Sequence, residues 1–405
     1  MKEYTTIKLR LHPTAEQAAL MEKTFGCCRW LWNRMLADVE EFYAASDLQY
    51  IPTPAHYKKE APFLREVDSQ PLCCVHQNLR QAFLNFFRNP GAFQYPRFKA
   101  KKDRRDTFTV YCRQYRTGPS IRLLKSGIEM PKLGLIPAAV HRRPLHWWQL
   151  KSVTVTKSRT GKYFCAIVFG YEAPEREAVP PLPERTLGLN YSPARFYVDS
   201  RGVSPVLPDL AKSREKLARL QSGLSRMEPG SRNYENQLRK IRIQHERVAN
   251  QRKDFIHKES RRIANAWDAV CVRDTDLVEL SRRLKGAGVM DAGFGMFRDC
   301  LKYKLERQGK AYIVVDQYAP AAKTCHACGR VNEQLSARER SWTCPSCGVV
   351  LTREVNTARN LREFGLKEIG ALSAVSYPPA AAGRDAGEGP GAAGSADLTG
   401  KALCL

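Results

Sequence analysis

The chain has 405 residues, of which 43% are hydrophobic, and its 66 Lys and Arg against 41 Asp and Glu give a formal net charge of +25. This hydrophobic content supports packed cores and excludes a disordered basic protein, and the length allows two or three domains. The basic excess indicates a polyanionic partner, and nucleic acid fits better than a membrane because no apolar run approaches the length of a transmembrane helix. Surface charge without such a partner is the alternative.

The first half of the chain is predicted to begin with a short strand at residues 3–10, followed by a helix. Thr14 is the expected N-cap of this helix, with Gln17 as its capping-box partner three residues later. A second helix covers residues 70–88, and a loop follows from residue 91. Alternating polar and apolar residues then predict strands between residues 107 and 170.

A proline-rich joint at residues 180–183 separates this half from the second one. There the pattern predicts two antiparallel strands, a long basic helical hairpin, and then strand, helix and strand, an order typical of a sheet covered by helices. A final helix precedes a tail rich in Ala, Gly, Pro and Ser, which is predicted to be disordered. The expected elements cover residues 186–190, 196–199, 209–265, 269–273, 291–308, 311–315 and 354–366, and the tail covers 371–405.

Two Cys-x-x-Cys pairs, Cys325/Cys328 and Cys344/Cys347, are separated by residues 329–343. This spacing is typical of a zinc ribbon, in which two tight turns present four thiolates to one tetrahedral zinc ion. Two disulfides or four unrelated core thiols are the alternatives, and disulfides are disfavoured because no secretory signal is present. The remaining cysteines are expected to be buried small hydrophobic residues: Cys27, Cys28, Cys73, Cys74, Cys112, Cys165, Cys271, Cys300 and Cys404.

Several stretches in order along the chain resemble one family. They are residues 25–33, 95–99, 249–258 and 291–295, and residues 315–325 leading into the Cys pairs. Over about residues 4–368 the chain resembles TnpB, the RNA-guided nuclease of insertion sequences, which is related to compact type V CRISPR effectors. The resemblance implies a protein that binds a guide RNA, recognises a short duplex motif beside its target, opens the DNA to an R-loop and cuts it.

The resemblance also implies an α+β multidomain fold. A wedge β-barrel would contain a helical recognition insert, and an RNase H-like RuvC α/β domain would contain the inserted Cys₄ zinc ribbon. The implied boundaries are 1–10 and 90–178 for the barrel, 11–89 for the insert, 179–320 and 350–370 for the RuvC-like domain with its hairpin 209–265, and 321–349 for the ribbon.

The chain departs from the family at the catalytic positions. RuvC chemistry needs three carboxylates around two Mg²⁺ ions. The matching positions carry Asn190, Arg273 and Glu354, and the companion acid is replaced by Thr352. A permanent cation at 273 would repel the metals, so we expect no catalytic Mg²⁺ and no enzyme activity. Arg273 is expected to pair with Glu354 instead.

Other acids are poor substitutes for the missing carboxylates. Asp274 follows Arg273 and would point to the opposite face of the strand. Asp276 lies beyond the strand end, and Asp199 lies too far along the neighbouring strand. Cleavage by a relocated site and decay of an unused gene are therefore weaker alternatives.

These residues predict a nuclease-inactive TnpB-like protein of the kind called TldR. It would repress transcription by occupying a guide-matched DNA target beside a short motif, with structural zinc and a guide RNA as cofactors. An active RNA-guided DNA endonuclease of an insertion sequence is one alternative, and a zinc-ribbon DNA-binding protein without guide RNA is another. The protein is expected to be a monomer on one RNA in the prokaryotic cytoplasm, at the nucleoid.

Candidate nucleic-acid contacts fall in three places. Polar side chains on the second helix are expected to read the adjacent motif, two cations in the following loop to contact phosphates, and the basic hairpin to bind guide RNA and heteroduplex. Tyr95 and Phe98 could stack on bases, but packing within the protein is expected. The hairpin cations could simply form a solvated helix face, and leucines are expected to form the core stripe of the hairpin. The candidates are Gln77, Asn78, Arg80 and Gln81; Arg97 and Lys99; and Arg239, Lys240, Arg242, Arg247, Gln251, Arg252 and Lys253, with Leu217, Leu220, Leu224 and Leu238 as the stripe.

Overall fold

The computed structural model describes residues 2–46, 51–101, 106–277, 279, 282, 293–336 and 338–373. The chain divides into two compact units between Pro174 and Glu175. The predicted disordered tail lies outside the described residues, apart from residues 371–373 at the end of the last helix.

Unit 1 contains a four-stranded antiparallel sheet in the order β1-β9-β8-β2. Every second residue of β1 from Thr5 is buried, as expected for a strand with one face on a core. Two short ribbons complete the strands of this unit. The bounds are β1 Lys2–Leu11, β2 Thr107–Tyr111, β3 Gln114–Tyr115, β4 Gly118–Pro119, β5 Arg122–Leu123, β6 Gly127–Met130, β7 Gly134–Pro137, β8 Gln149–Lys157 and β9 Tyr163–Glu172.

Helices α1 and α3 pack into the same core as this sheet. The predicted capping box is confirmed, because the Thr14 N–H donates to Gln17 Oε1 (3.1 Å) and the Gln17 N–H donates to Thr14 Oγ1 (3.2 Å). Asp68 caps α3 by accepting from the Gln70 N–H at 2.6 Å. The helices are α1 Ala15–Ser46, α2 Pro54–Glu60, the 3₁₀ turn η1 Pro62–Arg65 and α3 Ser69–Arg88.

Unit 2 is built on a second four-stranded sheet, in the order β11-β10-β12-β13. Strands β10, β12 and β13 are parallel, and β11 is antiparallel to β10. The predicted strand, helix, strand order is confirmed, and helices cover both faces of the sheet. The bounds are η3 Pro183–Arg185, β10 Thr186–Ser192, β11 Phe196–Asp199, β12 Ala269–Arg273, α8 Phe294–Glu306, β13 Ala311–Val315 and α9 Arg353–Ser373.

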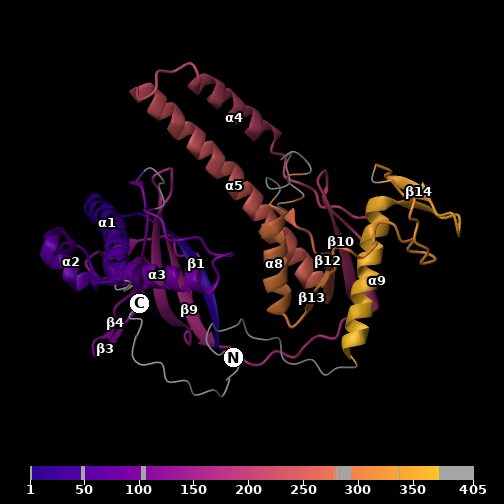
Figure 1. The fold of residues 1–405 in the computed structure, drawn as a ribbon, viewed down its shortest axis with the longest axis horizontal. Coiled ribbons are helices and arrows are strands. Elements are labelled where there is room, and N and C mark those ends of the chain that lie inside the picture. Colours follow the sequence, from indigo (N-terminus) through magenta and orange to yellow (C-terminus); the bar gives the residue numbers. More distant parts are fainter. Residues whose placement is uncertain are drawn as a thin grey trace. The chain divides into compact units, whose positions relative to one another are not determined.

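The two faces of this sheet pack differently. On one face, aliphatic residues of β10 and β12 form a core with α5 and α8. On the other, α9 lies directly against the backbone, as Figure 1 shows for the yellow helix beside β10. A Cβ added to Gly188 of β10 would meet the Ala358 carbonyl oxygen at 1.9 Å, and one added to Gly365 of α9 would meet Cys271 Sγ at 2.3 Å. Glycine is therefore required at both positions for the helix to approach the strands.

The predicted basic hairpin is confirmed as α4 (Ala211–Leu224) and α5 (Arg232–Ala266), joined by a turn with Gly230 at φ +85° (Figure 1). The leucines of the predicted stripe are only half-buried. Glutamine side chains also tie the two helices together, because Gln237 donates to the Leu220 carbonyl (2.9 Å) and Gln244 donates to the Ser213 carbonyl (3.1 Å). In the part of the chain described, no helix is both long and apolar enough to cross a membrane.

Candidate functional site

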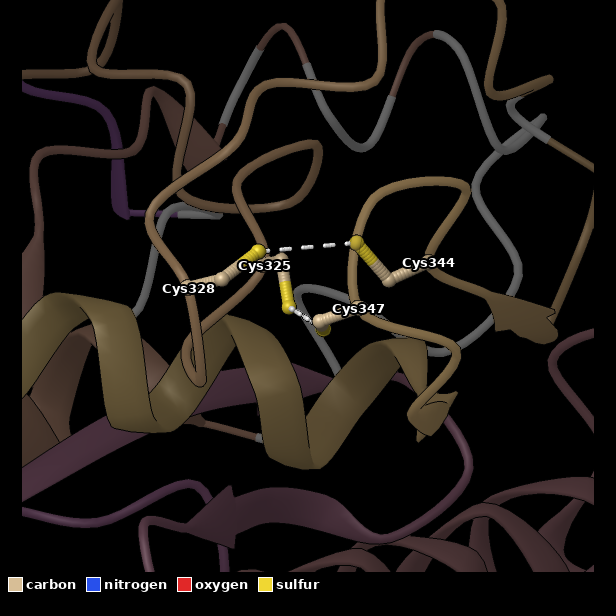
Figure 2. Close-up of side chains that lie close together, drawn as sticks. All are labelled: Cys325, Cys328, Cys344 and Cys347. Atoms are coloured by element: carbon tan, nitrogen blue, oxygen red, sulfur yellow. Dashed lines mark hydrogen bonds between the residues drawn. The ribbon is translucent and has the colours of Figure 1, made fainter.

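The four Cys-x-x-Cys thiols converge between two loops. Each sulfur lies within 4.8 Å of the others, with Cys325 and Cys347 Sγ 3.7 Å apart and Cys328 and Cys344 Sγ 3.6 Å apart (Figure 2). These separations are far longer than a disulfide bond of about 2.05 Å, so the disulfide alternative is wrong. They match the edge of about 3.8 Å of a tetrahedron with metal–sulfur bonds of about 2.3 Å.

The turns that carry the thiols are shaped for this role. Gly329 and Gly348 have φ of +76° and +74°, a conformation that side-chain-bearing residues rarely adopt. Backbone N–H groups of Cys347 and Ser346 point at the sulfur of Cys344 and lower the pKa of its thiol to about 6. A lowered pKa favours the thiolate, which is the form that binds a metal. The ribbon is completed by β14 Ser341–Thr343 and β15 Val350–Thr352.

Two buried asparagines of α9 hold the first Cys turn. Asn356 Oδ1 accepts from the His326 N–H (3.0 Å), and Asn356 Nδ2 donates to the Thr324 carbonyl (2.7 Å). Asn360, one turn further, donates to the Thr324 carbonyl (2.6 Å) and to the Ala321 carbonyl (2.8 Å). Sequence reasoning missed this network, although the i, i+4 spacing of the two asparagines places them on one helix face. The metal-binding turn and the start of α9 are therefore one connected unit.

The three predicted catalytic positions lie at the carboxyl edge of the sheet in unit 2. The last residue pair between β10 and β12 is Leu189 with Val272. Asn190 comes directly after Leu189, and Arg273 comes directly after Val272 as the last residue of β12. By strand alternation both residues share the α9 face with Gly188 and Cys271. Asn190 Nδ2 donates to the Glu354 carbonyl at 3.4 Å, so the first turn of α9 lies over this edge. The carboxyl edge of parallel strands is where α/β proteins place their ligands.

The predicted pairing of Arg273 with Glu354 is wrong. Glu354 Oε1 accepts from Ser192 Oγ (2.7 Å), and its Oε2 lies 4.0 Å from Arg195 Nη1. The Arg273 guanidinium donates instead to two backbone carbonyls of the turn after β13, Gln317 and Ala319. The Arg273 side chain therefore extends from the end of β12 to the turn that follows the neighbouring strand β13.

Arg273 is a cation without a carboxylate partner among the described residues. Burial lowers the pKa of its guanidinium, and the nearby charge of Arg353 lowers it further, while Asp316 opposes the shift. Arginine stays protonated under such shifts. Of the three matched positions, Glu354 alone therefore carries a carboxylate, while Arg195 lies near Glu354 and Arg353 lies near Arg273.

The other acids considered from sequence do not join Glu354. Asp199 is buried and accepts from the N–H groups of Arg201 (2.9 Å) and Val203 (2.8 Å), which fixes the turn after β11. Tyr312 packs on the opposite face of the sheet, where burial raises the pKa of its hydroxyl and the nearby charge of Asp274 adds to that shift. Asp276 Oδ1 accepts from the Glu279 N–H at 3.1 Å. Within the described ranges, the Cys₄ group is the only cluster of three or more His, Cys, Asp or Glu side chains placed to hold a metal.

The predicted nucleic-acid residues of unit 1 divide into two groups. Gln77, Asn78, Arg80 and Gln81 are all exposed on α3. The following loop is fixed to α1, because Trp32 Nε1 donates to the Arg97 carbonyl (2.9 Å) and Asn33 exchanges hydrogen bonds with the Lys99 backbone. These side-chain contacts from α1 set the course of residues 97–99.

Within this loop the individual side chains differ. Lys99 Nζ sits 3.5 Å from the centre of the Trp32 ring, while the Arg97 side chain is exposed. Tyr95 packs edge-on against Phe83 and Phe86, as expected. The packing prediction is wrong for Phe98, which is 53% exposed because the loop runs over the surface.

The hairpin candidates are mostly on the surface of α5. Four of them are exposed and three are half-buried. The exposed ones are Arg239, Lys240, Arg247 and Lys253, and the half-buried ones are Arg242, Gln251 and Arg252.

Three family descriptions match parts of the chain: "Helix-turn-helix domain" of IS605 OrfB proteins at residues 1–47, "Probable transposase" of the same group at 202–283, and "Cas12f1-like, TNB domain" at 294–361. In the structure, residues 2–46 form a strand and one long helix rather than two helices. The third match contains both Cys-x-x-Cys turns and the first turns of α9.

Full-length relatives match most of the chain. A Streptomyces pristinaespiralis protein named "Putative RNA-guided DNA endonuclease" is 31% identical over 372 residues, 89% of each chain. The Escherichia coli K12 protein named "Putative RNA-guided DNA endonuclease InsQ" is 29% identical over 392 residues, 90% of this chain and 93% of that protein. The fold is similar to that of Cas12f1 in a complex with sgRNA and target DNA, with a TM-score of 0.56, 13% identity, and coverage of 89% of this chain and 99% of that one. The chain belongs to the TnpB family of IS605-type RNA-guided DNA endonuclease-like proteins.

Proposed function

We propose that this protein is a nuclease-inactive, RNA-guided DNA-binding repressor. The observation that carries the proposal is the chemistry of the sheet edge, where a neutral amide, a cation and one carboxylate occupy the positions matched to three acids. Two-metal hydrolysis requires anionic oxygens that bind both ions and activate water. A single carboxylate, already bonded to Ser192 and close to Arg195, is too little for that chemistry.

The magnitude of the charge effect supports this conclusion. A guanidinium about 5 Å from a dication is repelled by about 7 kcal/mol at an effective dielectric constant near 20. The loss of two carboxylates removes the attraction that would offset this repulsion. In its place, the guanidinium groups at this edge favour a DNA phosphate that is held and not hydrolysed.

The guide-RNA part of the proposal rests on charge and family. The net charge is +25, and exposed cations line α5. Relatives that match nine-tenths of the chain carry the name RNA-guided DNA endonuclease. Pairing of the guide with the target strand would supply sequence specificity, and the protein would read a short adjacent motif and the backbone. Bound over a promoter as an R-loop, the complex would block RNA polymerase.

The fold supports an assignment of the units within this scheme. We assign unit 1 to the wedge domain with its helical insert, and unit 2 to a RuvC-like domain that carries a structural zinc ribbon. The four cysteines would hold the zinc, which supplies a cross-link between the two loops and no catalytic step. Asn356 and Asn360 connect that cross-link to α9 and so to the sheet edge.

An active endonuclease is the second candidate function. It is favoured by the retained acid Glu354 and by the names of the relatives. It would require metal ligands other than the two replaced positions. The two candidates share the guide RNA and differ only in what happens to the DNA.

Transcription with the purified complex tests the proposal. RNA that copurifies with the protein is sequenced, and its guide segment is placed in the promoter of a linear template. We expect transcription to fall several-fold only when promoter and guide match, while the template stays full-length. Equal transcription from matched and mismatched promoters, or the absence of a discrete copurified RNA, contradicts the proposal.

A further inference from the structure

One segment of unit 1, residues 130–171, is strongly basic and carries an exposed tryptophan, and it lies outside the candidate contacts considered so far. No Asp or Glu occurs between Glu129 and Glu172. The basic residues in that stretch are Lys132, Arg142, Arg143, Lys151, Lys157, Arg159 and Lys162. Lys157 pairs with Glu22 of α1 at 2.7 Å, so an acid from elsewhere in unit 1 reaches this segment. A local excess of cations with no acid in the same segment favours an anionic ligand.

This segment contains the loop of residues 139–148, which joins β7 to β8 and which we call the tryptophan loop. Its start is fixed to β1, because Ala138 forms a bridge with Leu11 and the Ala139 N–H donates to the Arg10 carbonyl at 3.2 Å. Its end is closed by a turn in which the Trp148 N–H donates to the Leu145 carbonyl at 3.0 Å. The loop therefore has a defined conformation.

The two adjacent tryptophans of this loop have opposite environments. Trp148 stacks on Tyr171 of β9, with ring centres 5.2 Å apart and an interplanar angle of 18°, and Arg142 lies 5.4 Å from the Trp148 ring. Trp148 thus anchors the loop on the sheet and positions Arg142. Trp147 is 52% exposed, and its ring contact among the described residues is the edge of His146 at 4.5 Å.

An exposed indole beside fixed cations has a specific chemical use. Every nucleobase has a π-face that can stack on an aromatic ring, and flanking phosphates bind arginine. Arg143 and His141 are exposed in the same loop, and neither Arg142 nor Arg143 forms an ion pair with any carboxylate of the described residues. A protein partner that covered Leu145 and Trp147 would bury these cations unless it brought acids of its own.

We propose that Trp147 stacks on an unpaired nucleobase and that Arg142 and Arg143 hold the phosphates beside it. The proposal rests on nucleic-acid binding in the proposed function and is independent of the nuclease question. The nucleotide could come from an unpaired segment of the guide RNA or from the displaced DNA strand. Both present the same chemistry, a base with flanking phosphates, and the experiment separates them.

The test measures binding at several salt concentrations with two probes, one for nucleic-acid-free protein and one for the RNA-loaded complex. The probes are the copurified RNA and, for the RNA-loaded complex, a target duplex with an unpaired bubble. We expect W147A to weaken binding of one probe at least five-fold and W147F to stay within two-fold of wild type, because phenylalanine still stacks. The R142Q/R143Q variant should make log K less steep in log salt by about 0.7 per lost phosphate contact.

Controls keep the outcomes distinct. L145A removes an exposed apolar side chain from the same loop and should leave both affinities unchanged. An equal loss of affinity with L145A and W147A would contradict stacking by Trp147. Unchanged melting temperatures confirm that the variants are folded. Loss of RNA binding identifies the guide as the source, and loss confined to the bubble identifies the displaced strand. Wild-type affinities for W147A overturn this proposal, whereas a wild-type protein that binds neither probe overturns the proposed function itself.

Discussion

Asn356 and Asn360 share one acceptor, and a double-mutant cycle can measure that arrangement. Both side-chain amides donate to the Thr324 carbonyl, at 2.7 and 2.6 Å, and Asn356 also accepts from the His326 N–H. The two asparagines are 1% and 3% exposed, so water cannot readily replace them. Replacement of either residue by alanine therefore leaves a buried polar group without its partner.

The size of each effect follows from the bonds that are lost. N356A leaves the half-buried His326 N–H unpaired, at a cost of about 1–3 kcal/mol, while Thr324 keeps its bond from Asn360. N360A leaves the Ala321 carbonyl unpaired, while Thr324 keeps its bond from Asn356. Only the double variant strips Thr324 of both donors. Its destabilisation should exceed the sum of the single effects by about 0.5–1 kcal/mol.

Thermal unfolding and metal release provide the assay. Each single variant should lower the melting temperature of unit 2 by roughly 3–10 °C, since 1 kcal/mol shifts a domain of roughly 150–250 residues by about 2–4 °C. Both should also release zinc to a chromophoric chelator faster than wild type. T352A, at an exposed position just before α9, is the matched control and should stay within about 0.5 kcal/mol of wild type. Strictly additive effects, or zinc release at the wild-type rate, refute the linkage between the ribbon and α9.

Three further predictions concern the metal, the packing of α9 and a buried carboxylate. Atomic emission should find one zinc per chain, and chelation should lower the melting temperature by several degrees with loss of sheet-edge protection in hydrogen exchange. G365A should lower the free energy of unfolding, measured by denaturant titration, by at least about 2 kcal/mol because its Cβ would lie 2.3 Å from Cys271 Sγ. G370A is the control: a Cβ there meets nothing within 4 Å, so the free energy of unfolding should stay the same or rise by up to about 1 kcal/mol. Burial raises the pKa of Glu259, but hydrogen bonds from Arg262 and the neighbouring tyrosine outweigh it and lower the pKa below 4.5. The ionised Glu259 carboxylate stabilises the fold fully when the pH is above the pKa of the unfolded state, near 4.5. This stabilisation is lost as the pH falls through the lower pKa of the folded state. E259Q should therefore reduce the pH dependence of the unfolding free energy in that acidic range and leave its dependence near neutral pH unchanged.

The features that sequence predicted well are those set by near neighbours. The capping box of Thr14 and Gln17 and the two Cys-x-x-Cys turns depend on residues a few positions apart. The alignment of Asn190 with Arg273 at one sheet edge was also predictable, because parallel strands align their carboxyl ends. The position of Glu354 near that edge was expected only from the resemblance to the family.

The features that sequence missed depend on contacts between distant segments. Arg273 was expected to seek the nearest opposite charge, but the carbonyls of the turn after β13 lie within its reach. Every residue has a backbone carbonyl, so the sequence does not indicate which carbonyls will accept hydrogen bonds from Arg273 until the fold is known. Likewise, adjacent aromatic residues such as Trp147 and Trp148 look equally apolar in sequence, and only the structure separates the anchor from the exposed ring.

A cleavage assay tests the central claim most directly. The complex with its own copurified RNA is incubated with a guide-matched target in the presence of Mg²⁺, and the DNA is analysed on a denaturing gel, with binding measured in parallel. We predict that the target is bound and stays intact, and that E354Q behaves like the wild type in both measurements. A cut product that appears with wild-type protein and disappears with E354Q would contradict the account.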